Sequence, residues 1–216
     1  LGMKALTGNT TGEDNTAVGA YALNANTTAN NNTAVGYNSL LNNSTGVANV
    51  AVGAISLDAN TTGQYNTAIG YESLSANTTA DENTALGSFA LRYNTTGGNN
   101  TAAGYKALED NTTASNNTAF GFETLNANTT GTANTAVGKD ALKLNTTADN
   151  NTAMGFDALE QNTTGGSNAA FGAYALASVT TGSQNTAVGR GALSDNTGSQ
   201  NTAVGYNALT SNTSAS

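Results

Sequence analysis

The residues that could carry the most definite chemistry are asparagines followed by two hydroxyl residues. Asn-x-Ser/Thr is the acceptor pattern of N-linked glycosylation. The pattern is weakly specific, because any sequence rich in Asn and Thr generates it. A carbohydrate-bearing column is therefore a hypothesis, which burial of these amides would contradict. The residues concerned are Asn9, Asn26, Asn43, Asn60, Asn77, Asn94, Asn111, Asn128, Asn145, Asn162 and Asn212.

Catalytic and metal-binding chemistry has few residues to use. Cys and His are absent, which removes a thiolate nucleophile, a His general base, disulfides and Cys/His metal sites. The carboxylates are scattered singly among the repeats, and the pairs Asp81-Glu82 and Glu109-Asp110 are typical of solvated turns. We expect no enzyme, no cofactor and no metal site.

The charge balance limits the partners. Fourteen acidic and six basic residues give a formal net charge of −8, whereas binding to a phosphate backbone needs clustered Lys and Arg. No apolar run reaches the roughly 18 residues of a membrane span. We expect neither nucleic-acid binding nor membrane insertion.

A 17-residue repeat organises the whole chain. The tripeptide Asn-(Thr/Val/Ala)-Ala opens units that start at residues 15, 32, 49, 66, 83, 100, 117, 134, 151, 168, 185 and 201. The last interval is 16, because the unit with Asn196-Thr197-Gly198 has one Thr where the others have two. Residues 1–216 form a single array, and we expect it to belong to a longer chain because neither terminal unit is atypical, as a cap would be.

Counted from that Asn as position 1, the unit has positions that tolerate little change. Position 3 is always Ala, position 5 always Gly and position 9 always Leu. Position 4 is apolar throughout and favours β-branched residues, so we predict that it faces the core. Charges occur only at positions 6, 7, 10, 11, 16 and 17, which predicts that these positions are the solvent-exposed ones.

This pattern predicts an all-β fold, a parallel β-solenoid of about thirteen 17-residue coils. At about 4.8 Å per coil the rod would be roughly 60 Å long. Thr-Ala-Val is expected as a strand and Gly as a turn, while the segment at positions 6–11 could be a second strand or one helical turn. A lone coil buries too little to fold, so ladders between coils must supply the stability.

The Asn columns have a structural interpretation as well. Asn occupies position 1 of every unit and position 12 of every unit except one, where Val179 replaces it. Side-chain amides repeated at every coil form ladders, each amide bonding its equivalent or the backbone one coil away. We predict such a ladder at position 1 and weigh it against carbohydrate at position 12.

Aromatic residues gather at positions 6 and 7. Such a column either covers the small core or packs against a neighbouring chain. The predicted inter-chain contacts are Tyr37, Tyr71, Tyr105, Phe122, Phe156 and Tyr206.

The Thr residues also suggest an ice-binding solenoid, which presents a regular hydroxyl array. Such faces use Thr on alternate residues of one strand, so that both point outward. Here the paired Thr are adjacent, and position 2 is followed by Ala-Val. The spacing is therefore a weak match to an ice-binding face.

The unit Asn-Thr-Ala-Val-Gly-Tyr-x-Ala-Leu-x-x-Asn-Thr-Thr-Gly, as in residues 32–46, resembles the repeat arrays of bacterial and phage tail-fibre-domain proteins. The resemblance covers the whole chain and implies a shaft. More distantly, Asn-Thr-Ala-Val-Gly is similar to the Asn-Ser-Val-Ala-Ile-Gly element of trimeric autotransporter adhesin heads, which implies a parallel β-roll and trimerisation.

We therefore expect a structural shaft of an extracellular, cell-surface or virion fibre. Its partners would be further copies of itself, as a homo-oligomer or an end-to-end filament. The alternative is an adhesin that binds a surface glycan through positions 6, 7, 10 and 11. The second alternative is the ice-binding solenoid.

Overall fold

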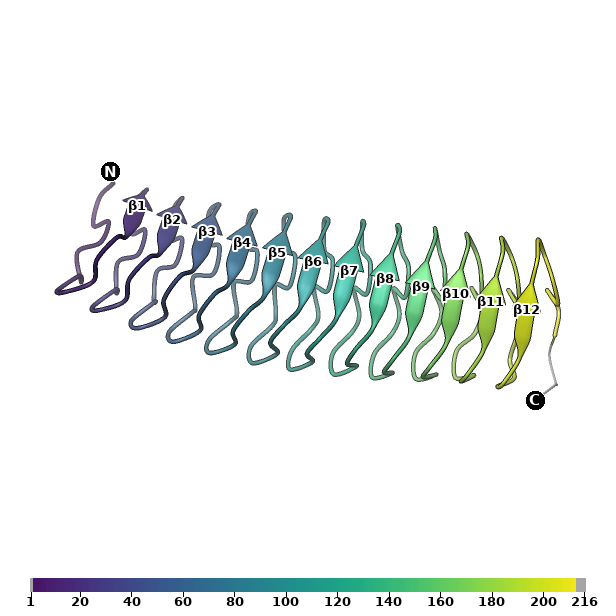
Figure 1. Ribbon diagram of the computed structural model, residues 1–216. Coiled ribbons are helices and arrows are strands. Elements are labelled where there is room, and N and C mark those ends of the chain that lie inside the picture. Colours follow the sequence, from purple (N-terminus) through teal and green to yellow (C-terminus); the bar gives the residue numbers. More distant parts are fainter. Residues whose placement is uncertain (1, 213–216) are drawn as a thin grey trace.

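The computed structural model describes residues 2–212, which form one parallel sheet of twelve short strands that follow the chain order (Figure 1). The prediction of a parallel β-solenoid is confirmed. The strands are β1 (Thr16–Val18), β2 (Thr33–Val35), β3 (Val50–Val52), β4 (Thr67–Ile69), β5 (Thr84–Leu86), β6 (Thr101–Ala103), β7 (Thr118–Phe120), β8 (Thr135–Val137), β9 (Thr152–Met154), β10 (Ala169–Phe171), β11 (Thr186–Val188) and β12 (Thr202–Val204).

Each strand pairs with the next one in register, so equal positions of the unit lie side by side. Ala34 pairs with Ala51, one 17-residue coil further on. Between β11 and β12 the same register is kept across 16 residues, with Ala187 opposite Ala203. The missing Thr is therefore absorbed outside the sheet.

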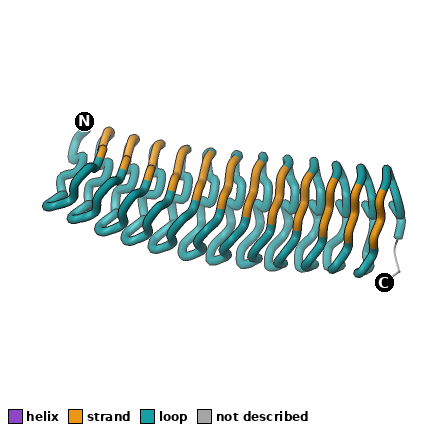
Figure 2. Tube along the Cα trace, in the orientation of Figure 1, coloured by secondary structure: helices purple, strands orange, loops and turns teal. Residues whose placement is uncertain are grey.

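The strands line one side of the solenoid, and turns and loops make up the rest of each coil (Figure 2). Within residues 2–212 there is no helix, so positions 6–11 form turns rather than the helical turn or second strand considered above. It follows that none of the described residues belongs to a helix that could cross a membrane.

The core is built from three inward columns. Ala at position 3, the small residue at position 8 and Leu at position 9 are fully buried through the middle of the array, as Ala68, Ser73 and Leu74 illustrate. The coil is so narrow that one Leu per turn fills it, which explains why position 9 never varies.

Position 4 does not face this core, and that prediction was wrong. Side chains of a strand alternate between its two faces. Because Ala at position 3 points inward, its neighbours at positions 2 and 4 point outward. Ile69 and Phe120 at position 4 are 42% and 44% exposed, whereas Ala68 and Ala119 before them are fully buried.

The turns after each strand need special backbone conformations. Gly104 at position 5 has φ +142°, and a Cβ there would also collide with the carbonyl oxygen of Gly121 in the next coil. Positions 7, 9 and 17 are left-handed, as at Ile55 (φ 59°), Leu57 (φ 51°) and Tyr65 (φ 58°). This conformation is rare for residues other than Gly, Asn and Asp.

Hydrogen bonds between coils continue around these turns. The Leu57 amide donates to the Ser73 carbonyl at 3.0 Å, and the Gly70 amide donates to the Val52 carbonyl at 2.8 Å. Because this bonding recurs from coil to coil, it holds the left-handed residues in place. The three-residue strands are thus only part of a ladder that surrounds the core.

Candidate interaction surface

The Asn at position 1 forms the predicted ladder inside the solenoid. The Asn66 amide nitrogen donates to the carbonyl of Ala80 at 2.8 Å, within its own coil. The Asn66 side-chain oxygen accepts the backbone N–H of Asn83 at 3.0 Å. This Asn therefore satisfies buried polar groups in two coils, which explains its presence at the start of every coil.

The Asn at position 12 forms a second, side-chain ladder. Asn77 Nδ2 donates to Asn60 Oδ1 at 3.0 Å and to the Ala80 carbonyl at 3.1 Å. The Ala80 carbonyl consequently accepts from both Asn columns. Where Val179 replaces Asn, the preceding Asn162 Oδ1 is buried and has no hydrogen-bond partner.

This geometry argues against carbohydrate at position 12. From Asn26 to Asn162 all nine candidate acceptors are fully buried, and the glycan would have to attach at an amide nitrogen that donates within the ladder. Asn9 and Asn212, in the first and last described coils, are partly buried, and both also donate from Nδ2. The folded solenoid leaves no outward acceptor in the nine inner coils.

An apolar stripe runs along the outer face of the sheet. We call the outward side chains of position 4 the strand stripe. Eight of its members are exposed large apolar residues, seven of them between 39% and 44% and Val204 at 71%. The strand stripe comprises Val18, Val35, Val52, Ile69, Leu86, Ala103, Phe120, Val137, Met154, Phe171, Val188 and Val204.

The predicted inter-chain residues at position 6 are exposed as well and form a second stripe. Tyr37, Tyr71, Tyr105, Phe122, Phe156 and Tyr206 are all among the exposed large apolar residues. Positions 4 and 6 hold most of the residues of this kind found within residues 2–212. They are two residues apart in the chain, so their Cα atoms lie within about 7.6 Å.

Most rings of this second stripe are linked along the axis by contacts with each other, with rings at position 7 or with cationic side chains. Tyr105 stacks on Phe122 with centroids 5.4 Å apart. Lys139 then bridges Phe122 and Phe156, with its ammonium 5.9 Å and 5.1 Å from their centroids. We call this the aromatic column, and it continues without a break through Tyr71, Phe89, Tyr105, Phe122, Lys139, Phe156, Tyr174, Arg190 and Tyr206.

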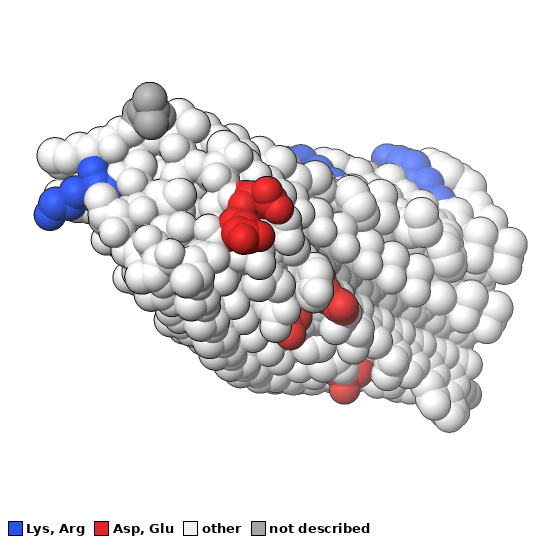
Figure 3. Space-filling view, turned by 60° about the vertical axis from the view of Figure 1, so that its left-hand side comes forward, with Lys and Arg blue, Asp and Glu red and all other residues white. Residues whose placement is uncertain are grey.

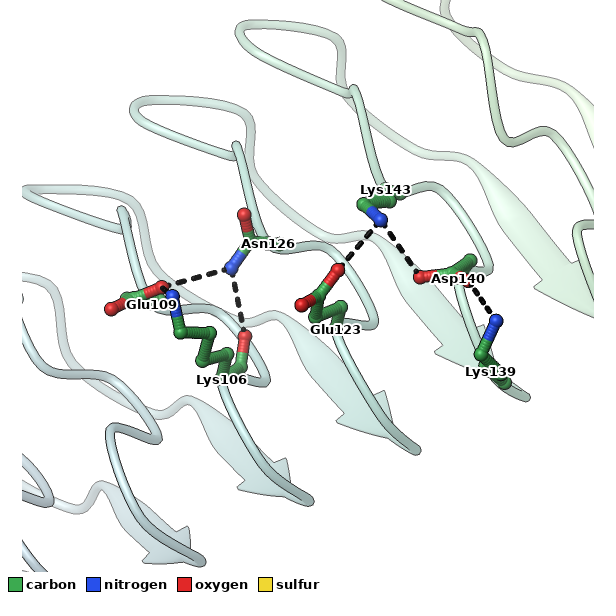
Figure 4. Close-up of polar contacts among 7 residues, drawn as sticks. All are labelled: Lys106, Glu109, Glu123, Asn126, Lys139, Asp140 and Lys143. Carbon is green, nitrogen blue, oxygen red and sulfur yellow. Dashed lines mark hydrogen bonds and ion pairs between the residues drawn. The ribbon is translucent and has the colours of Figure 1, made fainter.

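Charges at positions 7 and 10 pair between coils (Figure 4). Lys143 Nζ lies 2.6 Å from Glu123 Oε2 in the preceding coil and 3.1 Å from Asp140 Oδ1 in its own. The Asp140 and Glu109 residues are only 6% and 7% exposed. The prediction that charged positions mark the solvent face is therefore wrong at these two.

We call the charged side chains at positions 7 and 10, Asp58 among them, the polar strip, and their surroundings set their protonation. Burial raises the pKa of Asp58 to about 6, with a further contribution from the charge of Glu72. Burial would also raise the pKa of Asp140, but hydrogen bonds from Lys139 and Lys143 outweigh it and lower that pKa. The hydrogen bond with Glu123 raises the pKa of Lys143.

Charged side chains cover only small parts of the surface. In the face seen in Figure 3, acidic and basic side chains form isolated patches separated by wide uncharged areas. Over residues 2–212 we found no pocket and no group of side chains suited to hold a metal ion. The features that stand out on the surface are the two apolar stripes and the polar strip.

Comparisons with family models, curated proteins and solved structures gave no match to this chain.

Proposed function

We propose that this chain is a structural shaft, a stiff segment of an extracellular, cell-surface or virion fibre. The observation that carries the proposal is the unbroken register of twelve equivalent strands, β1 to β12. Each coil contacts its neighbours and extends the rod by one step, so length is the property that the repeat number sets.

The interior supports the same proposal. Leu at position 9 is buried in each coil from Leu23 to Leu193, and the Asn ladders follow the same axis. Such a rod resists bending, because bending would stretch hydrogen bonds on one side of every coil. The residues that vary are outside, where they leave the coil length unchanged.

A coil-number series tests the shaft. Deleting residues 100–116 removes one whole coil and brings Asn117 into the place of Asn100. We expect a folded rod that is about 4.8 Å shorter per deleted coil by small-angle scattering. The matched control deletes only residues 100–107, which removes part of a coil and should interrupt the rod at that place instead of shortening it by one step. A length that does not follow coil number would contradict the proposal.

Location is tested by immunogold labelling of the source cells and virions with an antibody against the array. The proposal expects label on surface filaments or virion fibres. Label confined to the cell interior would contradict it.

Ice binding is a second candidate, favoured by one observation. Thr at position 2 points outward beside position 4, as Thr33 and Val35 do in β2. Positions 2 and 4 therefore share an outward face, but only position 2 carries Thr there, so the objection raised from the sequence stands. Position 4, however, ranges from Ala103 to Phe120, which roughens the plane an ice lattice needs. Thermal hysteresis in solution would support this candidate over the shaft.

A further inference from the structure

We infer that the strand stripe is an interface between copies of this chain, so that a second copy lies side by side with the first against its sheet. The inference adds a self-association surface to the proposed shaft. It rests on the proposed function only for what that surface is for, and not for its existence. Its physical basis is the outward apolar column at position 4 and the column of rings beside it.

The outer face of the sheet has the apolar side chains that are typical of a surface covered by a partner. Leu86, Phe120 and Met154 expose about two fifths of their area from one sheet face. Soluble monomers rarely expose a continuous apolar patch larger than a few hundred Å². Here the inner face has its core, while position 4 on the outer face is exposed in eight of the twelve strands and half-buried in the other four.

A second copy fits this face better than an unrelated protein. Apolar side chains stand on it once per inter-strand step, a spacing of about 4.8 Å. Another copy of the same solenoid presents side chains at that same spacing along its whole length. An unrelated globular surface would match only a few steps.

Electrostatics allows the pairing of two acidic chains. Each copy carries a net charge of −8, which opposes association through charged surfaces. Positions 1 to 5 carry no charge in any coil. Two copies that meet at the strand stripe therefore keep their acidic turns away from the centre of the contact.

The area approaches that of a stable contact. Eleven steps of about 4.8 Å give a length of about 53 Å, and the strand positions 2–4 span about 10 Å at about 3.3 Å per residue. The product is roughly 530 Å² per copy for the strands alone, against the roughly 800 Å² per partner of stable protein complexes. Tyr37, Tyr71 and the other rings at position 6 would have to supply the remaining area at the border of the contact.

Variation at position 4 also favours a protein partner over ice. The column changes from Val52 to Ile69, Leu86, Ala103 and Phe120 in successive coils. Large and small side chains interdigitate in a packed interface, as they do in protein cores. A crystal lattice offers no such accommodation.

The test compares two triple variants that add the same charge. Ile69→Lys, Leu86→Lys and Phe120→Lys together place three ammonium groups on the strand stripe. Thr79→Lys, Thr96→Lys and Thr130→Lys place three on position 14, which is exposed in these coils. Circular dichroism first establishes that both variants are folded.

Sedimentation velocity then gives the mass of each protein. We expect the wild type and the Thr variant to sediment at the same multiple of 21.5 kDa, and the strand-stripe variant at the single-chain mass. A wild type at the single-chain mass would overturn the inference, and so would two triple variants of equal mass. A monomeric wild type whose thermal hysteresis is lost in the strand-stripe variant would assign the face to ice instead.

A second measurement tests the inference even if the Lys variant misfolds. The chain has no Cys, so Ile69→Cys and Thr79→Cys each introduce a single thiol. At a concentration where the wild type is associated, we expect a maleimide to label Ile69→Cys at least several-fold more slowly than Thr79→Cys. Equal rates would overturn the inference. A monomeric rod of the expected length would refute this interface and leave the proposed shaft standing.

Discussion

The coils up to Asn162 and the coils from residue 168 onward share a core but differ in their Asn ladder. In both regions Leu at position 9 is fully buried, as in Leu74 and Leu193, and the strands stay in register. The second region contains Val179 in place of Asn and the 16-residue coil. Its irregularities are confined to the part of the coil that lies outside the strand.

This difference distinguishes the features that every coil requires from the Asn ladder at position 12, which most coils have. The Leu core, the Gly turn and the strand register persist through the irregular coils, so they define the solenoid. The Asn ladder at position 12 is interrupted there and leaves Asn162 Oδ1 without a hydrogen bond. It therefore adds stability to a fold that the other features already specify.

The largest effect should come from breaking a feature that both regions share. In Gly104→Ala the new Cβ meets the Gly121 carbonyl, at a φ of +142° that side chains rarely adopt. We expect a loss of about 3 kcal/mol or more in unfolding free energy, measured by urea denaturation. The control Gly98→Ala has its nearest contact at 3.1 Å from the Asp81 carbonyl oxygen and should lose no more than about 1 kcal/mol. Equal losses would contradict the role given to position 5.

The second-largest effect should come from placing Val at position 12 of a regular coil. Asn111→Val removes the donor that reaches Asn94 Oδ1 at 2.8 Å and the acceptor of Asn128 Nδ2 at 3.0 Å. A buried polar atom without a partner costs about 1–3 kcal/mol, so we expect a loss of about 2 kcal/mol. Thermal unfolding would report it as a fall of roughly 5 °C. An unchanged melting temperature would show the ladder to be energetically neutral.

Restoring Asn at position 12 of the irregular coil should change the unfolding free energy by less, and in the opposite direction. Val179→Asn places a donor beside Asn162 Oδ1, which at present has none. We expect a gain of about 1 kcal/mol, because one buried acceptor becomes satisfied while one apolar side chain is lost. Made in an Asn162→Val background, Val179→Asn should bring no gain over that background, since the acceptor is then absent; Asn162→Val itself removes the bond from Asn162 Nδ2 to Asn145 Oδ1. A gain that survives in the double variant would refute the assigned cause.

The smallest effect lies on the outer polar strip and depends on pH. Burial raises the folded-state pKa of Asp58 to about 6, above the unfolded value near 3.9. The folded state therefore binds the proton more tightly, and stability falls as pH rises from about 4 to about 6. We expect Asp58→Asn to be more stable than wild type by about 1 kcal/mol above about pH 6, after allowing for solvent screening, and equal to it below about pH 4. Melting temperatures across this range check the sign, and a constant difference at all pH values would contradict it.

Sequence predicted the solenoid because its signals were repeated in every coil. Twelve Asn starts fixed the period, and constant Gly and Leu fixed one turn and one core slot. The Asn ladder at position 1 could be predicted for the same reason. Position 12 stayed ambiguous, because a buried Asn in a ladder and an Asn that accepts a glycan can have the same sequence, Asn-Thr-Thr.

Position 4 was misplaced because apolar character was taken to mean burial. In Thr-Ala-Val, either Ala or Val can face inward, and strand alternation alone does not choose. The space inside the coil decides, since Leu57 and its equivalents leave room only for Ala on the facing strand. The left-handed conformations at Ile55 and Leu57 gave no sequence signal either, because those residue types disfavour them.

The most direct test is the mass per unit length of the wild-type rod, measured by small-angle scattering. A single solenoid contributes one 17-residue coil per step of about 4.8 Å, and end-to-end growth leaves that ratio unchanged. The account predicts two or more chains in each cross-section, with the ratio falling to one chain in the strand-stripe Lys variant. A wild-type ratio of one chain would contradict it.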